Sequence, residues 1–141
     1  MNKTIAPLLL LGLCALPGTL LAQSACPTLP SGRNLHWESQ QGPDFQVCRA
    51  LDGQGEQVLG LMFTRKKPNV QLSRNQRREE GWVGSHPVYW YQPPIAEGGA
   101  AQKRITVLEL EDGRYAQVWV EGRDPSEIQA RLQLGAWLGL E

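Results

Sequence analysis

Two runs of alternating apolar and polar residues flank an Asp-Gly pair near the C-terminal end of the chain, and this pattern constrains the fold most. The runs cover residues 104–110 and 115–121, and Asp112-Gly113 lies between them. Asp-Gly between such runs is a strong hairpin signal, because both central residues of a type I′ turn adopt positive φ. We therefore expect an antiparallel hairpin with a two-residue loop at Asp112 and Gly113.

That loop also sets the expected register of the hairpin. It places Ile105 opposite Val120. Two residues further along it places Val107 opposite Val118, and these four side chains form the expected core-facing set. The reverse face then carries Thr106, Leu108, Leu110, Tyr115, Gln117 and Trp119. Because this reverse face mixes apolar and polar side chains, we expect the C-terminal helix or a partner to cover it.

Further strands are expected before the hairpin. Residues 34–39, 45–51 and 57–65 alternate in hydrophobicity and are separated by glycine-containing turns. The third segment is apolar on both faces, which favours a central position in a sheet. One bent strand or two short strands are expected within residues 82–91. Residues 92–103 contain Pro-Pro and Gly-Gly pairs and are expected to form a loop.

The last segment predicts one helix. Asp124 suits the N-cap, Pro125 suits the first helical position, and Glu127 supplies the acid of a capping box. The final turns are apolar almost all round, which is typical of a helix buried on more than one side. We expect Trp137 and Leu140 to fill the end of the core, and an exposed apolar patch for a partner is the alternative.

Together these elements predict an α+β fold that is mainly antiparallel β: a single curved or partly closed sheet of about six or seven strands with one C-terminal helix. A closed barrel with the helix as a plug is the alternative. The chain has 141 residues, including 15 glycines and 10 prolines. This length allows one domain, and this composition favours turns over long helices.

The first 22 residues have the layout of a secretory signal peptide: a basic start, an apolar run, a Pro-Gly break and a small residue at the end. We expect cleavage after Ala22, with residues 23–141 exported to the periplasm as a single β-rich domain. Lipid anchoring is not expected, because the residues before Cys14 and Cys26 are poor matches to a lipidation site.

Cleavage would remove Cys14 and leave Cys26 and Cys48. In an oxidising compartment two remaining cysteines most simply form one disulfide. In the chain-entropy model such a bond stabilises the fold by roughly 3 kcal/mol. The alternative is a cysteine nucleophile paired with His36 or His86, which would need a reduced thiol and a third orienting group.

Motifs for catalysis are absent from the sequence. It contains no P-loop, dinucleotide-binding fingerprint, metalloprotease helix or Cys-x-x-Cys pair. Ser85 lacks the flanking glycines of a nucleophile elbow. Glu109 and Glu111 have the spacing of a carboxylate pair, but the end of a hairpin is expected to leave both solvated. His36 and His86 are too far apart in sequence to suggest a metal site. We therefore expect a protein that is not an enzyme and holds no cofactor or metal.

Basic residues gather in residues 65–78, which include no acidic residue, whereas the rest of the exported domain is net acidic. This basic segment carries Arg65, Lys66, Lys67, Arg74, Arg77 and Arg78. Such a segment steers an acidic partner toward the surface and raises the association rate. A solvated loop without a partner is the alternative. Nucleic acid is not expected, because no aromatic residue interrupts the basic ones.

Aromatic residues and a histidine gather just after the basic segment. This aromatic cluster consists of Trp82, His86, Tyr89, Trp90 and Tyr91. Aromatic side chains are enriched in interface hot spots because they bury a large area with few rotatable bonds. Packing of all five inside the fold is the alternative.

A small exported domain with one disulfide, a basic segment and an aromatic cluster resembles periplasmic inhibitors and immunity proteins at the level of fold alone. We expect a binding protein of this type, which blocks a cell-wall hydrolase or a delivered toxin by surface complementarity. Its partner is expected to be one exported or envelope protein with an acidic surface, bound through the basic segment and the aromatic cluster. The alternative is an envelope protein that binds glycan, such as peptidoglycan, or a lipid headgroup.

Overall fold

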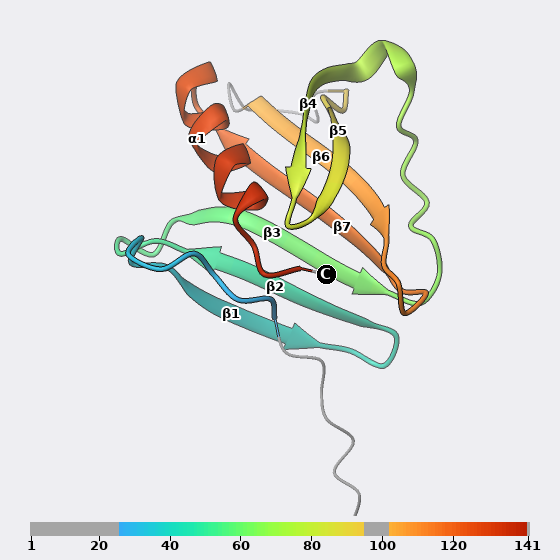
Figure 1. The fold of residues 1–141 in the computed structure, drawn as a ribbon, viewed down its shortest axis with the longest axis horizontal. Coiled ribbons are helices and arrows are strands. Elements are labelled where there is room, and N and C mark those ends of the chain that lie inside the picture. Colours follow the sequence, from blue (N-terminus) through green and yellow to red (C-terminus); the bar gives the residue numbers. More distant parts are fainter. Residues whose placement is uncertain (1–25, 95–101, 141) are drawn as a thin grey trace, which may run out of the picture.

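The computed structural model describes residues 26–94 and 102–140 (Figure 1). Within them the elements are β1 (His36–Gln41), β2 (Phe45–Leu51), β3 (Gln57–Thr64), η1 (Arg74–Gln76), β4 (Arg77–Val83), β5 (His86–Tyr91), β6 (Gln102–Glu109), β7 (Tyr115–Gly122) and α1 (Pro125–Ala136). The expected signal peptide, residues 1–22, lies outside the described residues, and so does the middle of the expected loop at 92–103.

The seven strands form one antiparallel sheet in the order β1-β2-β3-β7-β6-β5-β4. In the described part of the chain β1 and β4 occupy the two outer edges, so the sheet is open. This arrangement confirms the predicted α+β fold with a seven-stranded antiparallel sheet and one C-terminal helix. The closed barrel, with the helix as its plug, is wrong.

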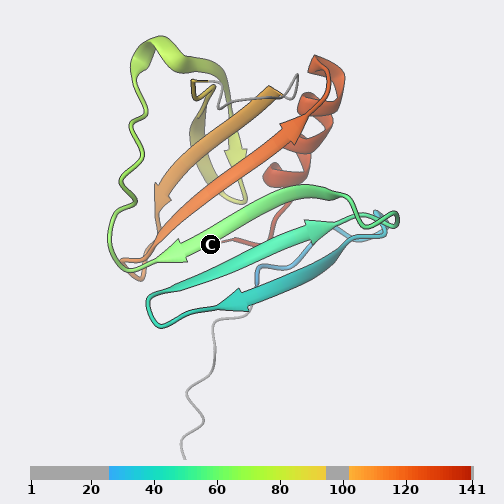
Figure 2. The same cartoon turned by 180° about the vertical axis from the view of Figure 1, so that it is seen from behind.

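The helix α1 covers one face of the sheet (Figure 1). Its apolar side chains, including Ile128 and Leu132, pack with Leu59, Leu61 and Val118 from the central strands. The view from behind shows the opposite face, where α1 no longer lies in front of the sheet (Figure 2). The core therefore lies between α1 and the sheet. No helix of the described residues is long and apolar enough to span a lipid bilayer.

The start of α1 has the expected N-cap, but the reciprocal hydrogen bond of the expected capping box is displaced by one residue. The Asp124 carboxylate accepts a hydrogen bond of 2.9 Å from the backbone N–H of Glu127. The Glu127 carboxylate in turn accepts one of 3.0 Å from the backbone N–H of Arg123, one residue before the cap. The backbone N–H groups of Glu127 and Arg123 therefore both have partners, and Pro125, the first helical residue, has no N–H to satisfy.

The β6–β7 hairpin forms, but its expected loop is wrong. The Leu110 N–H donates to the Arg114 carbonyl at 2.8 Å, so three residues rather than two lie between the strands. Gly113, the last residue of this loop, has a φ of +83°. A three-residue loop that ends in a left-handed glycine is the next most common hairpin connection after the two-residue turns.

The extra loop residue shifts the hairpin register by one and exchanges the faces of β6. Ile105 lies opposite Trp119 instead of Val120, and Thr106 lies opposite Val118. Val118 and Val120 therefore share the helix-covered face with Thr106 and Leu108, while Ile105 and Val107 lie on the opposite face. The expected core-facing set is thus half wrong, because side chains alternate along a strand and a one-residue shift inverts one strand against the other.

Two other expectations concern the ends of the domain. Cys26 and Cys48 form the expected disulfide, which ties the N-terminal arm to β2. At the C-terminal end Leu138 and Leu140 are buried, whereas Trp137 is 46% exposed, with the Arg33 guanidinium 4.7 Å from its ring centre. Leu140 therefore fills the end of the core as expected, but Trp137 does not.

Candidate functional site

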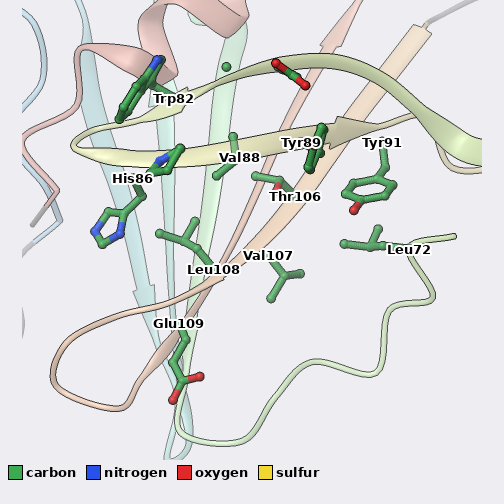
Figure 3. A pocket seen from close by; sticks show the side chains of 13 residues that line it. Leu72, Trp82, His86, Val88, Tyr89, Tyr91, Thr106, Val107, Leu108 and Glu109 are labelled. Atoms are coloured by element: carbon green, nitrogen blue, oxygen red, sulfur yellow. The ribbon is translucent and has the colours of Figure 1, made fainter. Parts of the chain in front are cut away.

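The sheet is split between β5 and β6. These two strands pair only at Tyr91 and Ile105, whereas the other neighbouring strands pair along most of their length. Beyond that pair they leave a cleft of about 790 Å³ between them, which we call the β5–β6 cleft (Figure 3). Its volume falls within the range of about 300–1,000 Å³ that is typical of ligand sites.

At the closed end of the cleft, an ion pair holds the outer strands against β6. The Arg104 guanidinium of β6 donates to the Glu79 carboxylate of β4 at 2.8 Å, and this contact reaches across β5. The Arg104 side chain is only 8% exposed. A carboxylate partner is needed at such a site, because an unpaired buried charge is strongly destabilising.

At the wide end of the cleft, the C-terminal residues hold the tip of the β4–β5 hairpin away from β6. The Gly84 N–H donates to the Gly135 carbonyl at 3.0 Å, and the Ser85 N–H donates to the Leu140 carbonyl at 3.3 Å. Gly84 has a φ of +56°, and a Cβ there would lie 2.3 Å from the Leu140 carbonyl oxygen. Only glycine fits this close approach, so the open position of the tip depends on Gly84.

The two sides of the cleft differ in chemistry. Toward the helix-covered face it is lined by Val88, Thr106 and Leu108. Toward the opposite face it is lined by Val107 and by the exposed carboxylate of Glu109, which Figure 3 shows at the end of β6. The cleft is therefore apolar on the side of the core, and its opposite side combines aromatic side chains with exposed carboxylates.

His86 also lines the cleft on its helix-covered side, near Leu108 (Figure 3). Its Nε2 atom is buried, and no hydrogen-bond partner for it exists among the described residues. Buried polar atoms in folded proteins nearly always have a partner. Because the nitrogen is buried, it lies beneath the surface of the cleft and not on it.

Backbone groups of β6 also point into the cleft. Hydrogen-bonded and non-hydrogen-bonded pairs alternate along an antiparallel ladder. Because Leu110 is hydrogen-bonded to Arg114, the same alternation makes Leu108 and Thr106 hydrogen-bond to β7. The N–H and C=O groups of Val107 and Glu109 point the other way, toward β5, and β5 has diverged from β6 at this point.

The facing edge of β5 follows the same rule. Val83 and His86 close the two-residue turn of the β4–β5 hairpin, so His86 and Val88 hydrogen-bond to β4. The backbone groups of Tyr89 and the carbonyl of Pro87 then point toward β6. Two strand edges without strand partners therefore face each other across the β5–β6 cleft.

Most of the aromatic cluster borders the cleft. Trp82, His86, Tyr89 and Tyr91 line it, and Trp82 and Tyr89 are 53% and 42% exposed. Trp90 is different. It is 1% exposed and lies against Gly81 and Gly135, where an added Cβ would come within 3.0 and 3.6 Å of the indole. Trp90 is a core residue in this fold, and we omit it from the candidate site.

The basic segment divides into two parts. Arg77 belongs to the aromatic cluster in space: its guanidinium lies 4.1 Å from the ring centre of Tyr89 and donates to the Tyr91 hydroxyl at 3.2 Å. Arg78 donates to the Gln92 side chain at 2.9 Å. These two arginines are held by contacts within the fold.

The other four basic side chains are exposed: Arg65, Lys66, Lys67 and Arg74. Within the described part of the chain, no residue of the basic segment takes part in an ion pair. Leu72, in the loop between the two groups of basic residues, lines the cleft (Figure 3). The basic segment therefore runs past the cleft, and its cations remain open to solvent.

Sequence reasoning missed several residues of this site. Glu80, Leu72 and the edge of β6 from Thr106 to Glu109 were not expected to line a cleft. Glu109 was considered only together with Glu111, which lies in the β6–β7 turn. Alternation of apolar residues predicts that β5 and β6 are strands, but it carries no signal for where two neighbouring strands separate.

Among the described residues, no group of three or more His, Cys, Asp and Glu side chains is placed to hold a metal ion. The chain matches no protein-family model, no curated protein and no solved structure.

Proposed function

We propose that the protein is an exported binding protein of the inhibitor type. In this proposal it blocks one protein partner, such as a cell-wall hydrolase or a delivered toxin, by surface complementarity. The observation that carries the proposal is the β5–β6 cleft, which has exposed aromatic side chains on one side and the basic segment beside it.

Export to the periplasm is part of this proposal. The Cys26–Cys48 disulfide supports it, because structural disulfides persist in oxidising compartments and are rare in the cytosol. The apolar run among the first 22 residues supports it from the sequence.

A protein partner with an acidic surface is supported by the basic segment. Its exposed cations include Lys66 and Lys67, and neither is neutralised by a neighbouring carboxylate in the described structure. Free cations at the rim of an interface mainly raise the association rate, and salt screens this effect.

The exposed aromatic residues supply the expected contact area. Trp82 and Tyr89 lie beside the cleft, and residues of these types carry much of the binding energy at protein interfaces. Arg77, stacked on Tyr89, holds that ring in place from one side. An aromatic ring that is already fixed loses little conformational freedom on binding.

The exposed rings also support the second candidate, an envelope protein that binds glycan. Flat aromatic side chains stack on sugar rings, and Trp82 and Tyr89 are positioned to do so at the edge of the cleft. Such binding would depend on the rings and much less on the charge of the basic segment.

Affinity capture tests the proposal. The exported domain, residues 23–141, is immobilised and exposed to envelope extract and, separately, to purified peptidoglycan. We expect one protein to be retained from the extract, and we expect the Trp82→Ala variant and the Lys66→Glu/Lys67→Glu double variant each to reduce its retention at least about tenfold.

Trp137→Ala is the matched control, because Trp137 is a similarly exposed tryptophan outside the cleft. This variant is expected to retain the partner as the wild type does. Retention of peptidoglycan alone, unaffected by the lysine substitutions but lost with Trp82→Ala, would support the glycan-binding candidate instead. Retention that no substitution changes would contradict both.

A further inference from the structure

We infer that the β5–β6 cleft binds an extended peptide segment, which adds to β6 as a strand and whose apolar side chains alternate with basic ones. This inference rests on the proposed function, because the segment is expected to belong to the partner protein. It identifies the chemistry that the cleft recognises.

The backbone edges of the cleft favour an added strand. The N–H and C=O groups of Val107 and Glu109 point into the cleft and have no strand partner, and the groups of Tyr89 face them from β5. These groups repeat every second residue, which matches the spacing of hydrogen-bonding groups along an extended peptide. Addition of a strand to such an edge is a common mode of peptide recognition.

The side chains on the two faces of the cleft favour apolar groups that alternate with basic ones. A strand added beside β6 would direct alternate side chains toward the helix-covered face, where Val88 and Leu108 favour apolar groups. The intervening side chains would lie on the opposite face, which carries the exposed carboxylates of Glu80 and Glu109. None of the described residues that line the cleft is Lys or Arg. Lys or Arg on the peptide would therefore complement this face.

The cleft is also held open before any ligand binds. Arg104 and Glu79 fix β6 to the outer strands at one end, and Gly84 is tied to Gly135 at the other end. Because both ends are fixed, the cleft between β5 and β6 exists before a strand is added. Preorganisation of this kind lowers the conformational cost of binding.

The test uses two capped hexapeptide probes, one of alternating valine and lysine and one of alternating valine and glutamate. Each is titrated into the ¹⁵N-labelled exported domain and followed by NMR. We expect the valine–lysine peptide to shift the amide signals of Val107 and Glu109 and to slow their hydrogen exchange. The valine–glutamate peptide is expected to bind at least about tenfold more weakly.

Two variants separate the backbone contribution from the charge contribution. Val107→Pro removes an N–H that the fold does not use, which proline substitution tolerates at a strand edge, and it should abolish binding. Glu80→Lys/Glu109→Lys changes only exposed side chains and should reverse the preference between the two probes. This charge variant keeps the inference testable if Val107→Pro fails to fold.

Three outcomes would overturn the inference: no shift on β6 with either probe, shifts confined to the outer strands β1 and β4, or self-association of the domain through β6 without peptide. If the probes fail while affinity capture still retains a protein through Trp82 and Lys66, strand addition is wrong and the proposed function stands. If the probes bind but no partner protein is retained, the cleft binds peptides and the inhibitor proposal is contradicted.

Discussion

The backbone N–H of Gly84 donates to the carbonyl of Gly135 at 3.0 Å, and this contact joins the tip of the β4–β5 hairpin to the C-terminal end of α1. The two residues are far apart in sequence, yet their contact sets the separation of β5 from β6. The position of the hairpin tip is therefore decided by the helix and the residues that follow it. A cleft in the sheet results from how the C-terminal residues pack.

The first prediction concerns this contact. Gly84→Ala places a methyl group at a positive φ and 2.3 Å from a backbone oxygen that has little freedom to move. Gly113→Ala is the matched control, because its φ is +83° and an added Cβ there has nothing within 4 Å. We expect Gly113→Ala to lower the free energy of unfolding by about 1–2 kcal/mol, and Gly84→Ala by at least about 1 kcal/mol more. Urea unfolding measures both, and equal losses would contradict this role of Gly84.

The second prediction concerns the ion pair at the closed end of the cleft. Glu79→Gln leaves the buried Arg104 guanidinium without its carboxylate, and we expect a loss of about 3 kcal/mol in the free energy of unfolding. The double variant Arg104→Met/Glu79→Met removes both charges and should be more stable than Glu79→Gln. Thermal and urea unfolding of the three proteins test this order. If the double variant were less stable than Glu79→Gln, the ion pair would stabilise the fold by more than the removal of an unpaired buried charge explains.

The third prediction concerns the disulfide. Cys26→Ala/Cys48→Ala removes the link between the N-terminal arm and β2, and the chain-entropy model gives a loss of about 3 kcal/mol. A reducing agent should lower the stability of the wild type by a similar amount and leave that of the double variant unchanged. If reduction left the wild type unaffected, the two thiols would not be joined in the purified protein.

The fourth prediction concerns pH. Hydrogen bonds from the Arg123 side chain and backbone hold the pKa of the Glu127 carboxyl below its usual value of 4.5. Because the folded protein favours the ionised form, Glu127 stabilises the fold above that pH, and this contribution is lost as the pH falls through the lowered pKa. Glu127→Gln should therefore be less stable than the wild type near neutral pH, and the difference should shrink in acid. A difference that stays constant in thermal melts from about pH 7 to about pH 3 would contradict this assignment.

Local sequence patterns predicted most of the fold. Alternation located most strands of the sheet, but not the first part of β4, because residues 77–81 have no clear apolar period and were not expected to form a strand. Asp124, Pro125 and Glu127 located the start of α1 because capping depends on neighbouring residues. The hairpin register was wrong because Asp112-Gly113 fits both a two-residue and a three-residue loop, and the sequence does not distinguish them. In the observed register, Leu108 and Val118 both lie in the core beneath the helix.

The candidate site was harder to predict, because it depends on contacts between distant segments. The sequence drew attention to the aromatic cluster, but not to the burial of Trp90 against Gly135 or to the pairing of Arg104 with Glu79. Each of these contacts joins residues that are far apart in the sequence. The exposed part of the cluster, with Trp82 and Tyr89, is what remains available for binding.

The central claim is that β6 presents a free edge inside the sheet, and native-state amide hydrogen exchange tests it most directly. Val107 and Gln117 lie opposite each other in the β6–β7 hairpin, but the amide of Gln117 points to β3 whereas that of Val107 points into the cleft. We predict that in the free protein the amide of Val107 exchanges much faster than those of Gln117, Thr106 and Leu108. Equally slow exchange at Val107 would show that β5 closes onto β6 in solution, and it would contradict the account.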